Sequence, residues 1–418
     1  MNASEVKINI IGAGISGLIA AHLLESYGFK PVIWEASDRP GGRMKTDLID
    51  GYQLDRGFQV LLDQYPSLKK YLNFDELELQ KLLPGVLIIK DNKRYSFGDP
   101  LRSFSSFWSS AFSPVAKLSD LSKLFRLRND LASKDLRDHF KGERTTSLEF
   151  LKSYGFSDQV IENFFRPFFS GIFLENELKT SSEMLQFVYA LFSKGNAVIP
   201  KAGIEAVPKQ LAEKLKDTKL HFNTKIDRIE EGKLIINGVD QIASDFTIIA
   251  CDPSKIVPQL ANDSVLWNRL DTFYYEVDKD VFNKPILGLE TNDDFINHLF
   301  YPQSVSVVSR GEKELISVNV VKRKNESTDN LKRHIEDYLD QKLGLSEARL
   351  IKQYEIEKAL PRFERMQYDL SAEESMLSEN VYVIGDQQIN PSQNAAILSA
   401  EAVVSAIVDK EMNKQFKQ

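Results

Sequence analysis

The string GAGISG, residues 12–17, limits the fold of this chain more than any other feature of its sequence. Residues 6–11 before it form a short apolar run that predicts a buried strand. Residues 15–27 after it carry apolar side chains at helical spacing and lead to Gly28, a residue type that favours helix ends. A second apolar strand is predicted at residues 32–35. The order strand, helix, strand predicts a βαβ unit in a parallel sheet that is covered on both faces.

Each residue of this glycine turn has a defined task if the turn binds a dinucleotide. Gly12 permits the tight turn, Gly14 lets the backbone approach a pyrophosphate, and Gly17 lets the helix pack on the strand. Ile15 and Ser16 open the helix, whose N-terminus offers N–H groups and a positive dipole end to phosphates. A chance glycine cluster is the alternative, but the flanking strand and helix are the context that the motif requires.

Glu35 ends the second predicted strand, about 20 residues beyond the glycine turn. A dinucleotide-binding unit places at this point the acid that receives the ribose hydroxyls. The spacing of these motifs suits NAD and FAD equally, so the choice of cofactor depends on the residues that follow. A pure NAD dehydrogenase is the alternative assignment.

Composition limits the partners of the chain. Its 418 residues are too many for one compact core, so two structural domains are expected. The net charge of −7 argues against nucleic acid, because phosphate binding needs a surplus of Lys and Arg. Cys251 is the only cysteine and the five histidines are scattered, so neither a disulfide nor a metal site is expected. Cys251 follows an apolar run and is expected to be an inert, part-buried thiol.

The first apolar stretch is short and has no basic region before it, so no secretory signal is predicted. No stretch approaches the roughly 18 uninterrupted apolar residues of a membrane span. These features predict a cytoplasmic protein.

Nucleotide-fold character appears in three separated segments, with other patterns between them. Later strands are predicted at residues 219–223, 225–229, 233–236, 246–250 and 381–384, and helices from Ser113-Pro114, at 330–343 and at 395–408. We therefore predict an α/β chain, α+β overall. Its discontinuous Rossmann-type domain comprises residues 1–75, 195–255 and 362–418. An inserted substrate domain of mixed sheet and helix comprises residues 76–194 and 256–361, with its helical part near 101–194.

Residues 35–43 read E-A-S-D-R-P-G-G-R. They resemble the string E-A-x-x-x-x-G-G-R of a flavin superfamily that includes monoamine and polyamine oxidases, protoporphyrinogen oxidase, and the phytoene and carotenoid desaturases. This resemblance implies that the cofactor is FAD. Ala36 belongs to the string, Gly41 and Gly42 would let the backbone wrap the diphosphate, and Arg43 would add a forked cation for phosphate.

Three further segments resemble the same superfamily. Residues 55–59 resemble a D-x-G-x-x segment that runs beside the flavin ring. Residues 195–204 resemble a segment that opens the middle part of the FAD domain. Residues 224–229 resemble a strand whose backbone contacts the adenine. The cofactor contacts that these segments imply are Gly57, Phe58, Gln59 and Ile226.

The C-terminal segment is the second specific match. Residues 381–386 read V-Y-V-I-G-D and precede an alanine-rich helix. The superfamily places the pair Gly385-Asp386 at a strand end, where Asp386 would hold the ribityl chain. Ala395 and Ala396 begin the helix, whose positive end would face the pyrimidine ring and stabilise reduced flavin.

The predicted substrate domain is rich in aromatic residues, which favours a small hydrophobic substrate. Residues 161–173 are rich in Phe, and Pro167 and Gly171 are expected to break any continuous helix there. We interpret this segment as an aromatic core rather than a substrate floor. Residues 101–112 are expected to form an aromatic helical face, for which core packing is favoured over peripheral membrane contact.

Departures from the superfamily bear on the substrate. Residues 387–393 hold no aromatic side chain, so a cation–π cage for an amine is not expected. Cys251 lies far from the C-terminal segment where monoamine oxidases attach their flavin, so noncovalent FAD is expected. No catalytic side chain is assigned; Lys284 lies near a plausible strand end, as many lysines do.

The resemblance thus implies an FAD-dependent dehydrogenase, desaturase or oxidase. Such an enzyme would pass a hydride from a lipophilic, isoprenoid- or carotenoid-like substrate to flavin N5. Two alternatives stay open: an amine oxidase that releases peroxide, and a flavoprotein that uses FAD for a non-redox isomerisation.

Overall fold

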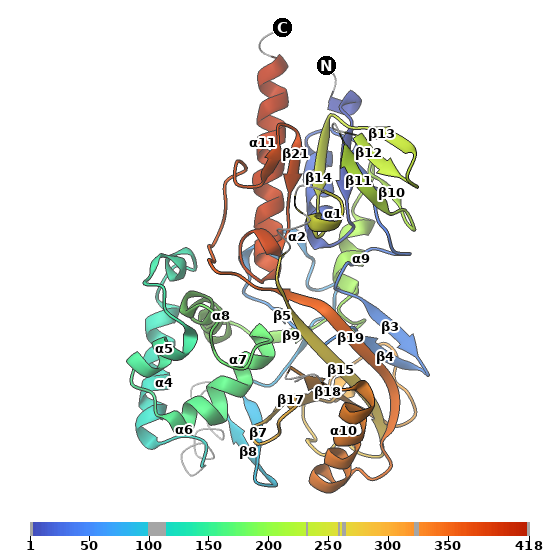
Figure 1. The fold of residues 1–418 in the computed structure, drawn as a ribbon. Helices are drawn as coiled ribbons and strands as arrows, with labels where there is room; N and C mark the ends of the chain where they lie inside the picture. The colour runs from blue at the N-terminus through green and yellow to red at the C-terminus, as the bar shows by residue number, and fades with distance from the viewer. Residues whose placement is uncertain are drawn as a thin grey trace.

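The computed structural model describes residues 3–98, 114–230, 233–257, 260, 265–321 and 326–415. Within these residues the chain forms an upper and a lower unit, each built on a sheet, with a group of helices beside the lower sheet (Figure 1). The predicted aromatic face at 101–112 lies outside the described residues. None of the described helices combines the length and apolar character needed to cross a membrane.

The upper unit is built on a sheet whose described strands run in the order β10-β2-β1-β14-β21-β20. Its strands are β1 (Ile8–Ile11), β2 (Val32–Trp34), β10 (Lys219–His221), β14 (Phe246–Ile249), β20 (Met376–Ser378) and β21 (Val381–Val383). All neighbours pair in parallel except β20 and β21. The glycine turn joins β1 to α1 (Ile15–Ser26), so the predicted βαβ unit is confirmed.

Alternate residues of this sheet enter two different cores. Ile10 and Ile248 pack with Leu18 of α1 and with α11 (Gln393–Gln415), and the two helices lie side by side. Ile11 and Ile249 pack on the other face against a small antiparallel sheet. That sheet consists of β11 (Ile226–Glu230), β12 (Lys233–Ile236) and β13 (Asp240–Ala243). Both faces of the parallel sheet are therefore covered, as predicted, although β13 was not predicted.

The lower unit is built on a mainly antiparallel sheet in the order β19-β15-β18-β17-β16-β7-β8. Its strands are β7 (Val86–Lys90), β8 (Lys93–Phe97), β15 (Trp267–Val277), β16 (Leu287–Glu290), β17 (Ile296–Phe300), β18 (Glu314–Val320) and β19 (Arg349–Pro361). The helix α10 (Thr328–Leu343) packs on one face of this sheet through Leu331 and Ile335. The other face is turned toward the upper unit.

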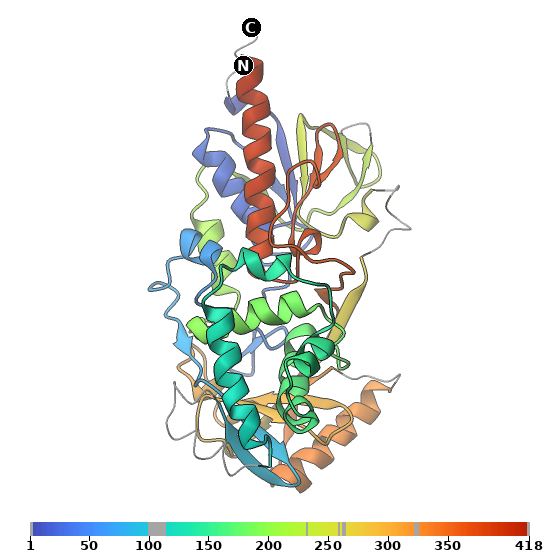
Figure 2. The ribbon, with the colours of Figure 1, turned by 90° about the vertical axis from the view of Figure 1, so that its left-hand side faces the viewer.

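The helical group lies along one side of the lower sheet (Figure 2). Its elements are α4 (Leu118–Ala132), η2 (Arg137–Lys141), α5 (Ser147–Ser153), α6 (Asp158–Val160), η3 (Ile161–Phe165), α7 (Arg166–Phe173) and α8 (Ser182–Lys194). The prediction of a helix start at Ser113-Pro114 was wrong: α4 begins at Leu118, Pro114 lies in a turn, and Ser113 is outside the described residues.

The predicted break within residues 161–173 was also wrong. The π-helical turn η3 runs directly into α7, and Pro167 occupies the first turn of α7. The Arg166 N–H donates to the Ile161 carbonyl oxygen, so the hydrogen bonding is π-helical directly before the proline. The interpretation of this segment as an aromatic core is confirmed, since Phe165, Phe169 and Phe173 are each at most 1% exposed.

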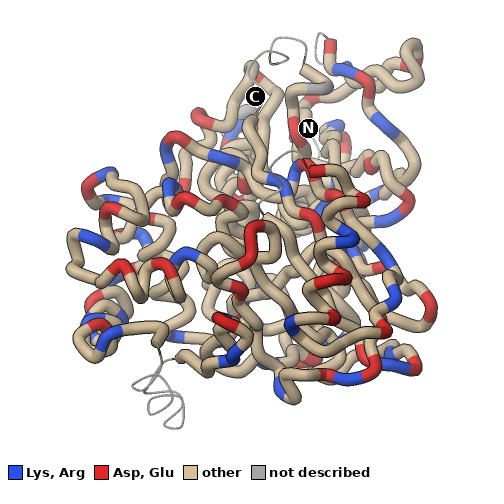
Figure 3. Tube along the Cα trace, turned by 60° about the horizontal axis from the view of Figure 1, so that its bottom comes forward, with Lys and Arg blue, Asp and Glu red and all other residues tan. Residues whose placement is uncertain are grey.

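Shorter elements complete the described fold. They are η1 (Ala3–Glu5), β3 (Thr46–Ile49), β4 (Tyr52–Asp55), β5 (Leu61–Leu62), α2 (Pro66–Tyr71), β6 (Gln80–Lys81), β9 (Ala197–Ile199), α9 (Ala206–Glu213), η4 (Pro253–Lys255), η6 (Pro302–Ser304) and η7 (Asp386–Gln388). Acidic and basic residues are interspersed along the described chain (Figure 3). The charge of the molecule is thus distributed rather than gathered on one element.

Candidate functional site

The turn between β1 and α1 contains one glycine that the packing of the protein does not require. Gly12 has φ +108°, and a Cβ there would lie 3.0 Å from the Ala250 carbonyl oxygen. A Cβ at Gly17 would lie 2.1 Å from the Gly12 carbonyl oxygen. Gly14 has an ordinary φ of −75°, and a Cβ there would meet no described atom within 4 Å. The turn therefore leaves open space at Gly14, the position predicted to approach a pyrophosphate.

Glu35 follows β2 beside this turn. Its carboxylate accepts hydrogen bonds from the Ala13 N–H at 2.7 Å and from Ser37, whose N–H and Oγ lie at 2.8 and 2.6 Å. The Glu35 backbone oxygen accepts from the Thr224 N–H at 2.9 Å. This contact sets the start of β11, and with it Ile226, beside the acid. Ala36 lies next to Glu35 in the same loop, so the residues predicted for the adenosine half of the cofactor lie together.

The Gly41-Gly42 pair folds over the glycine turn. Both residues have positive φ, +137° and +59°, which favours glycine. The Gly41 N–H donates to the Ala13 carbonyl oxygen at 2.9 Å, and a Cβ at Gly42 would lie 3.3 Å from Gly14 Cα. The two glycine segments therefore flank the same open position.

Arg43 connects the first and the last segments of the chain. Its Nη2 lies 2.5 Å from Oδ1 of Asp386, and its Nη1 donates to the Ala359 carbonyl oxygen at 3.1 Å. The guanidinium lies over the ring of Trp267, 5.4 Å from the centroid. The Lys358 ammonium lies 5.9 Å from the same centroid. Two basic side chains thus lie over the ring of Trp267, a residue that the sequence did not indicate as part of the site.

The turn that carries Asp386 is held by α11. Gly385 has φ +133°, and its N–H donates to Ser399 Oγ at 2.8 Å. The N–H of Ala395 donates to Ser392 Oγ at 3.0 Å, and that of Ala396 donates to the Ser392 carbonyl oxygen at 3.2 Å. The N–H groups of both alanines are therefore engaged within the protein, and their contact with the cofactor stays a prediction.

Phe58 and Gln59 extend from the glycine loops to the lower sheet. The Gln59 amide donates to the Arg43 carbonyl oxygen at 2.9 Å. The ring of Phe58 packs against His298 and Phe300 of β17, with centroids 5.1 and 5.2 Å apart. A Cβ at Gly57 would lie 3.0 Å from a side-chain carbon of Ile356 on β19, so this segment passes closely between the two units.

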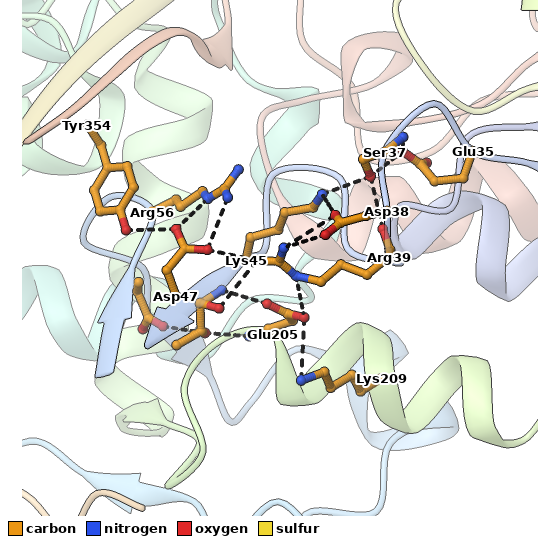
Figure 4. A network of polar contacts seen from close by, with 12 residues as sticks. Glu35, Ser37, Asp38, Arg39, Lys45, Asp47, Arg56, Glu205, Lys209 and Tyr354 are labelled. Atoms are coloured by element: carbon orange, nitrogen blue, oxygen red, sulfur yellow. Dashed lines mark hydrogen bonds and ion pairs between the residues drawn. The ribbon is translucent and has the colours of Figure 1, made fainter. Parts of the chain in front are cut away.

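A network of charged side chains fixes the loops from another side (Figure 4). Glu205, whose side chain is 2% exposed, accepts from Arg39 Nε at 2.9 Å and from the Thr46 N–H at 2.9 Å. Asp47 accepts from Arg39, Arg56 and the Tyr354 hydroxyl. The network ties the loop after β2 to the hairpin β3-β4, to the start of α9 and to β19. Its role is structural, because its members satisfy one another.

Asp55 belongs to the same network. Its Oδ1 accepts from Thr46 Oγ1 at 2.6 Å and from the Ile204 N–H at 3.0 Å. A Cβ at Gly203, where φ is +84°, would lie 2.8 Å from that oxygen. The segments 55–59 and 195–204 therefore meet at a buried carboxyl group, which supports the loop that carries Phe58.

Replacing Asp55 with Asn is expected to remove a pH-dependent loss of stability. Burial raises the pKa of Asp55 from 3.8 to about 6, against the opposing hydrogen bonds from Thr46 and Ile204. The folded chain therefore binds this proton more tightly than the unfolded chain. The stability that Asp55 contributes is fully present below pH 3.8 and is lost as the pH rises through about 6. Urea unfolding of wild type and Asp55→Asn at several pH values measures the difference. A difference that does not change with pH over that range would show that folding does not raise the pKa of Asp55.

Cys251 lies at the end of β14 and is part-buried. Burial raises the pKa of its thiol to about 12, which disfavours the nucleophilic thiolate. The predicted part-burial of Cys251 is confirmed, and its inertness stays a prediction. Among the described residues, no cluster of His, Cys, Asp and Glu has the composition of a metal site.

Comparison with known proteins decides the family. A model of the family described as flavin containing amine oxidoreductase matches residues 15–271, more than half of the chain. The chain belongs to the flavin-containing amine oxidoreductase family. The family is one of flavin-containing oxidoreductases, in agreement with the FAD cofactor that the resemblance implied.

Solved structures share the fold of this chain along nearly its whole length. An oxidoreductase from Methanosarcina mazei, at 15% identity, covers 96% of this chain and 100% of its own, with a TM-score of 0.74. Cyclohexylamine oxidase from Brevibacterium oxydans, at 16% identity, covers 97% and 99%, with a TM-score of 0.70. Protoporphyrinogen oxidase 2 of Arabidopsis thaliana is 30% identical over 89 residues, which are 21% of this chain and 17% of that protein. The matched stretches span less than a fifth of the curated relatives.

The residues at this site fit FAD. The open position at Gly14 lies between two glycine loops, as a diphosphate requires. Arg43 and Lys358 lie at Trp267, beside those loops, and they pair with the carboxylates of Asp386 and Asp252. The Trp267 Nε1–H is buried without a partner among the described residues, so a donor is available there. Cradle, cations, acid and unpartnered donor together match the chemistry of a dinucleotide that bears two phosphates.

Proposed function

We propose that the chain binds FAD noncovalently at the junction of β1, β2 and the Gly385-Asp386 turn, and that it oxidises a small lipophilic molecule beside Phe58. The residues proposed to contact FAD are those predicted from the sequence: Gly12, Gly14, Ile15, Ser16, Gly17, Glu35, Ala36, Gly41, Gly42, Arg43, Gly57, Phe58, Gln59, Ile226, Gly385, Asp386, Ala395 and Ala396. We retain the proposed division into an FAD-binding domain (1–75, 195–255 and 362–418) and a substrate domain (76–194 and 256–361).

The contact of Phe58 with β17 carries the proposal. Phe58 belongs to the segment proposed to lie beside the flavin, and its half-buried ring packs on Phe300 and His298 of the lower sheet. Val60 and Val305 pack in the same apolar cluster. A substrate held between the two units would therefore meet aromatic and aliphatic surface, which favours a lipophilic molecule.

The side chains of this site bind, orient and exclude water. FAD, when bound, supplies an acceptor for a hydride. Glu35 would accept hydrogen bonds from the ribose hydroxyls, Arg43 would pair with phosphate, and Asp386 would accept from the ribityl chain. Because Arg43 and Asp386 pair with each other in the free protein, FAD binding would exchange one ion pair for two contacts with the cofactor.

Oxidation of an amine is the second candidate, favoured by the name of the family. The residues after Asp386 argue against the usual aromatic cage, since residues 387–393 contain no aromatic side chain. Anaerobic mixing of the FAD-loaded protein with a panel of polyenes and a panel of lipophilic amines separates the two. Bleaching of the visible flavin band by a polyene supports the leading proposal. Bleaching by amines alone, with peroxide formed on admission of air, would replace it with amine oxidation.

A further inference from the structure

A row of buried polar residues crosses the lower sheet on the face turned toward the upper unit. Thr272 of β15, Asn319 of β18 and His298 of β17 are neighbours in register, and each is at most 2% exposed. Thr272 Oγ1 donates to Asn319 Oδ1 at 2.7 Å, and Asn319 Nδ2 donates to Ser317 Oγ at 2.9 Å. These residues satisfy one another. In this row, the imidazole of His298 has a ring nitrogen, Nε2, without a hydrogen-bond partner among the described residues.

The hydrogen bonds around His298 define its tautomer. Asn297 Nδ2 donates to the Pro167 carbonyl oxygen at 3.1 Å, which turns Oδ1 of the same amide toward the imidazole. His298 Nδ1 lies 2.9 Å from that oxygen. Because an amide oxygen only accepts, Nδ1 carries the proton and Nε2 carries a lone pair. Burial lowers the pKa of His298 to about 3, so the ring is neutral.

The lone pair of Nε2 has no hydrogen-bond partner among the described residues, and the atom is buried. Buried acceptors are usually paired, because an unpaired one loses its bond to water and gains nothing in return. The imidazole cannot turn away easily: a Cβ at Gly171 of α7 would already lie 3.1 Å from Nδ1. The ring is held between α7 on one side and the edge contact with Phe58 on another.

An aromatic side chain packs on the imidazole. Phe58 contacts both His298 and Phe300, and it is the half-exposed member of the group. Gln59, the next residue, donates to the Arg43 carbonyl oxygen. His298 therefore lies one side chain away from the loop proposed to contact the flavin, and it offers a single fixed acceptor in an aromatic setting.

We propose that His298 Nε2 accepts a hydrogen bond from an N–H or O–H group of the substrate, and that the substrate is a lipophilic molecule with one such donor. The inference rests on the proposed function, because that function places the substrate beside Phe58. A lipophilic alcohol, phenol or amine satisfies the acceptor. A plain hydrocarbon, an ether or a neutral tertiary amine leaves it unpaired.

Binding of naphthol and of its methyl ether to the FAD-loaded protein tests this inference. The two probes share one aromatic body and differ in the O–H donor. Perturbation of the flavin spectrum during titration gives each affinity without any turnover. We expect naphthol to bind about tenfold more tightly, since a buried hydrogen bond discriminates by roughly that factor. Equal affinities for the two probes in the wild-type protein would overturn the inference.

Variants of the chain show whether His298 causes the tighter binding of naphthol. His298→Phe keeps the ring shape without the acceptor and is expected to bind the two probes equally. His298→Gln keeps an acceptor and is expected to retain a preference for naphthol, so it serves if the Phe variant does not fold. His139→Phe is the matched control, because His139 is also buried with unpartnered ring nitrogens among the described residues but lies on η2. A preference that survives in His298→Phe would overturn the inference.

The outcome is separable from that of the proposed function. If naphthol is preferred through His298 but no substrate ever reduces the flavin, the proposed oxidation fails and the binding role of His298 stands. If hydrocarbons reduce the flavin and the two probes bind equally, the proposed oxidation stands and this inference fails.

Discussion

Gly14→Ala is expected to abolish FAD binding and to leave the FAD-free protein as stable as wild type within about 1 kcal/mol. The new Cβ would meet no described protein atom within 4 Å, and φ at this position is an ordinary −75°. Alanine caps the helix less well than glycine, which lowers the free energy of unfolding. It also reduces the conformational entropy of the unfolded chain, which partly offsets that loss. The methyl group would instead occupy the space proposed for the diphosphate.

Gly17→Ala is the matched control, because it is expected to lower the stability of the FAD-free protein, which Gly14→Ala leaves nearly unchanged. Its Cβ would lie 2.1 Å from the Gly12 carbonyl oxygen and 3.1 Å from Ala250 Cβ. Backbone on both sides must shift, so a loss of about 3 kcal/mol in the free energy of unfolding is expected. Urea unfolding of FAD-free protein and titration with FAD measure the two effects. Undiminished FAD affinity in Gly14→Ala would place the diphosphate elsewhere.

Glu35→Ala is expected to raise the dissociation constant for FAD about 100-fold. Each hydrogen bond to a charged acceptor contributes roughly 1.5–3 kcal/mol, and the ribose would lose that acceptor. The Ala13 N–H would also lose its partner at 2.7 Å, so a modest loss of stability accompanies the change. Titration of the FAD-free protein by flavin fluorescence measures the affinity.

Two variants control the Glu35 result. Glu35→Gln keeps the shape and one acceptor oxygen, so its affinity is expected to fall between those of wild type and Glu35→Ala. Glu379→Ala removes a carboxylate whose side chain is 87% exposed and tests the effect of net charge alone. Wild-type affinity in Glu35→Ala would remove this residue from the ribose site and weaken the assignment of the whole loop.

The parts of the fold that follow from local pattern could be predicted from the sequence. The strand, glycine turn and helix at residues 8–26 depend on neighbours in the chain, and they form as predicted. The helix break at Pro167 failed for a reason that is not local. The helix passes from π-helical to α-helical hydrogen bonding directly before the proline, a change of register that the local pattern does not predict.

The site itself depends on contacts between distant residues. Arg43 and Asp386 are 343 residues apart, and only the resemblance to a flavin superfamily linked them. Trp267 and His298 carried no signal in the sequence. The tautomer of His298 depends on Asn297 and Pro167, and the position of its ring depends on Gly171 and Phe58. The candidate role of His298 could therefore be found only from the three-dimensional arrangement.

The visible spectrum of the purified chain, recorded before and after addition of FAD, tests the central claim most directly. We expect flavin absorbance bands from an equimolar amount of FAD that stays with the protein through gel filtration and is released when the protein unfolds. A colourless protein that takes up no FAD, or that takes up NAD in its place, would contradict the account.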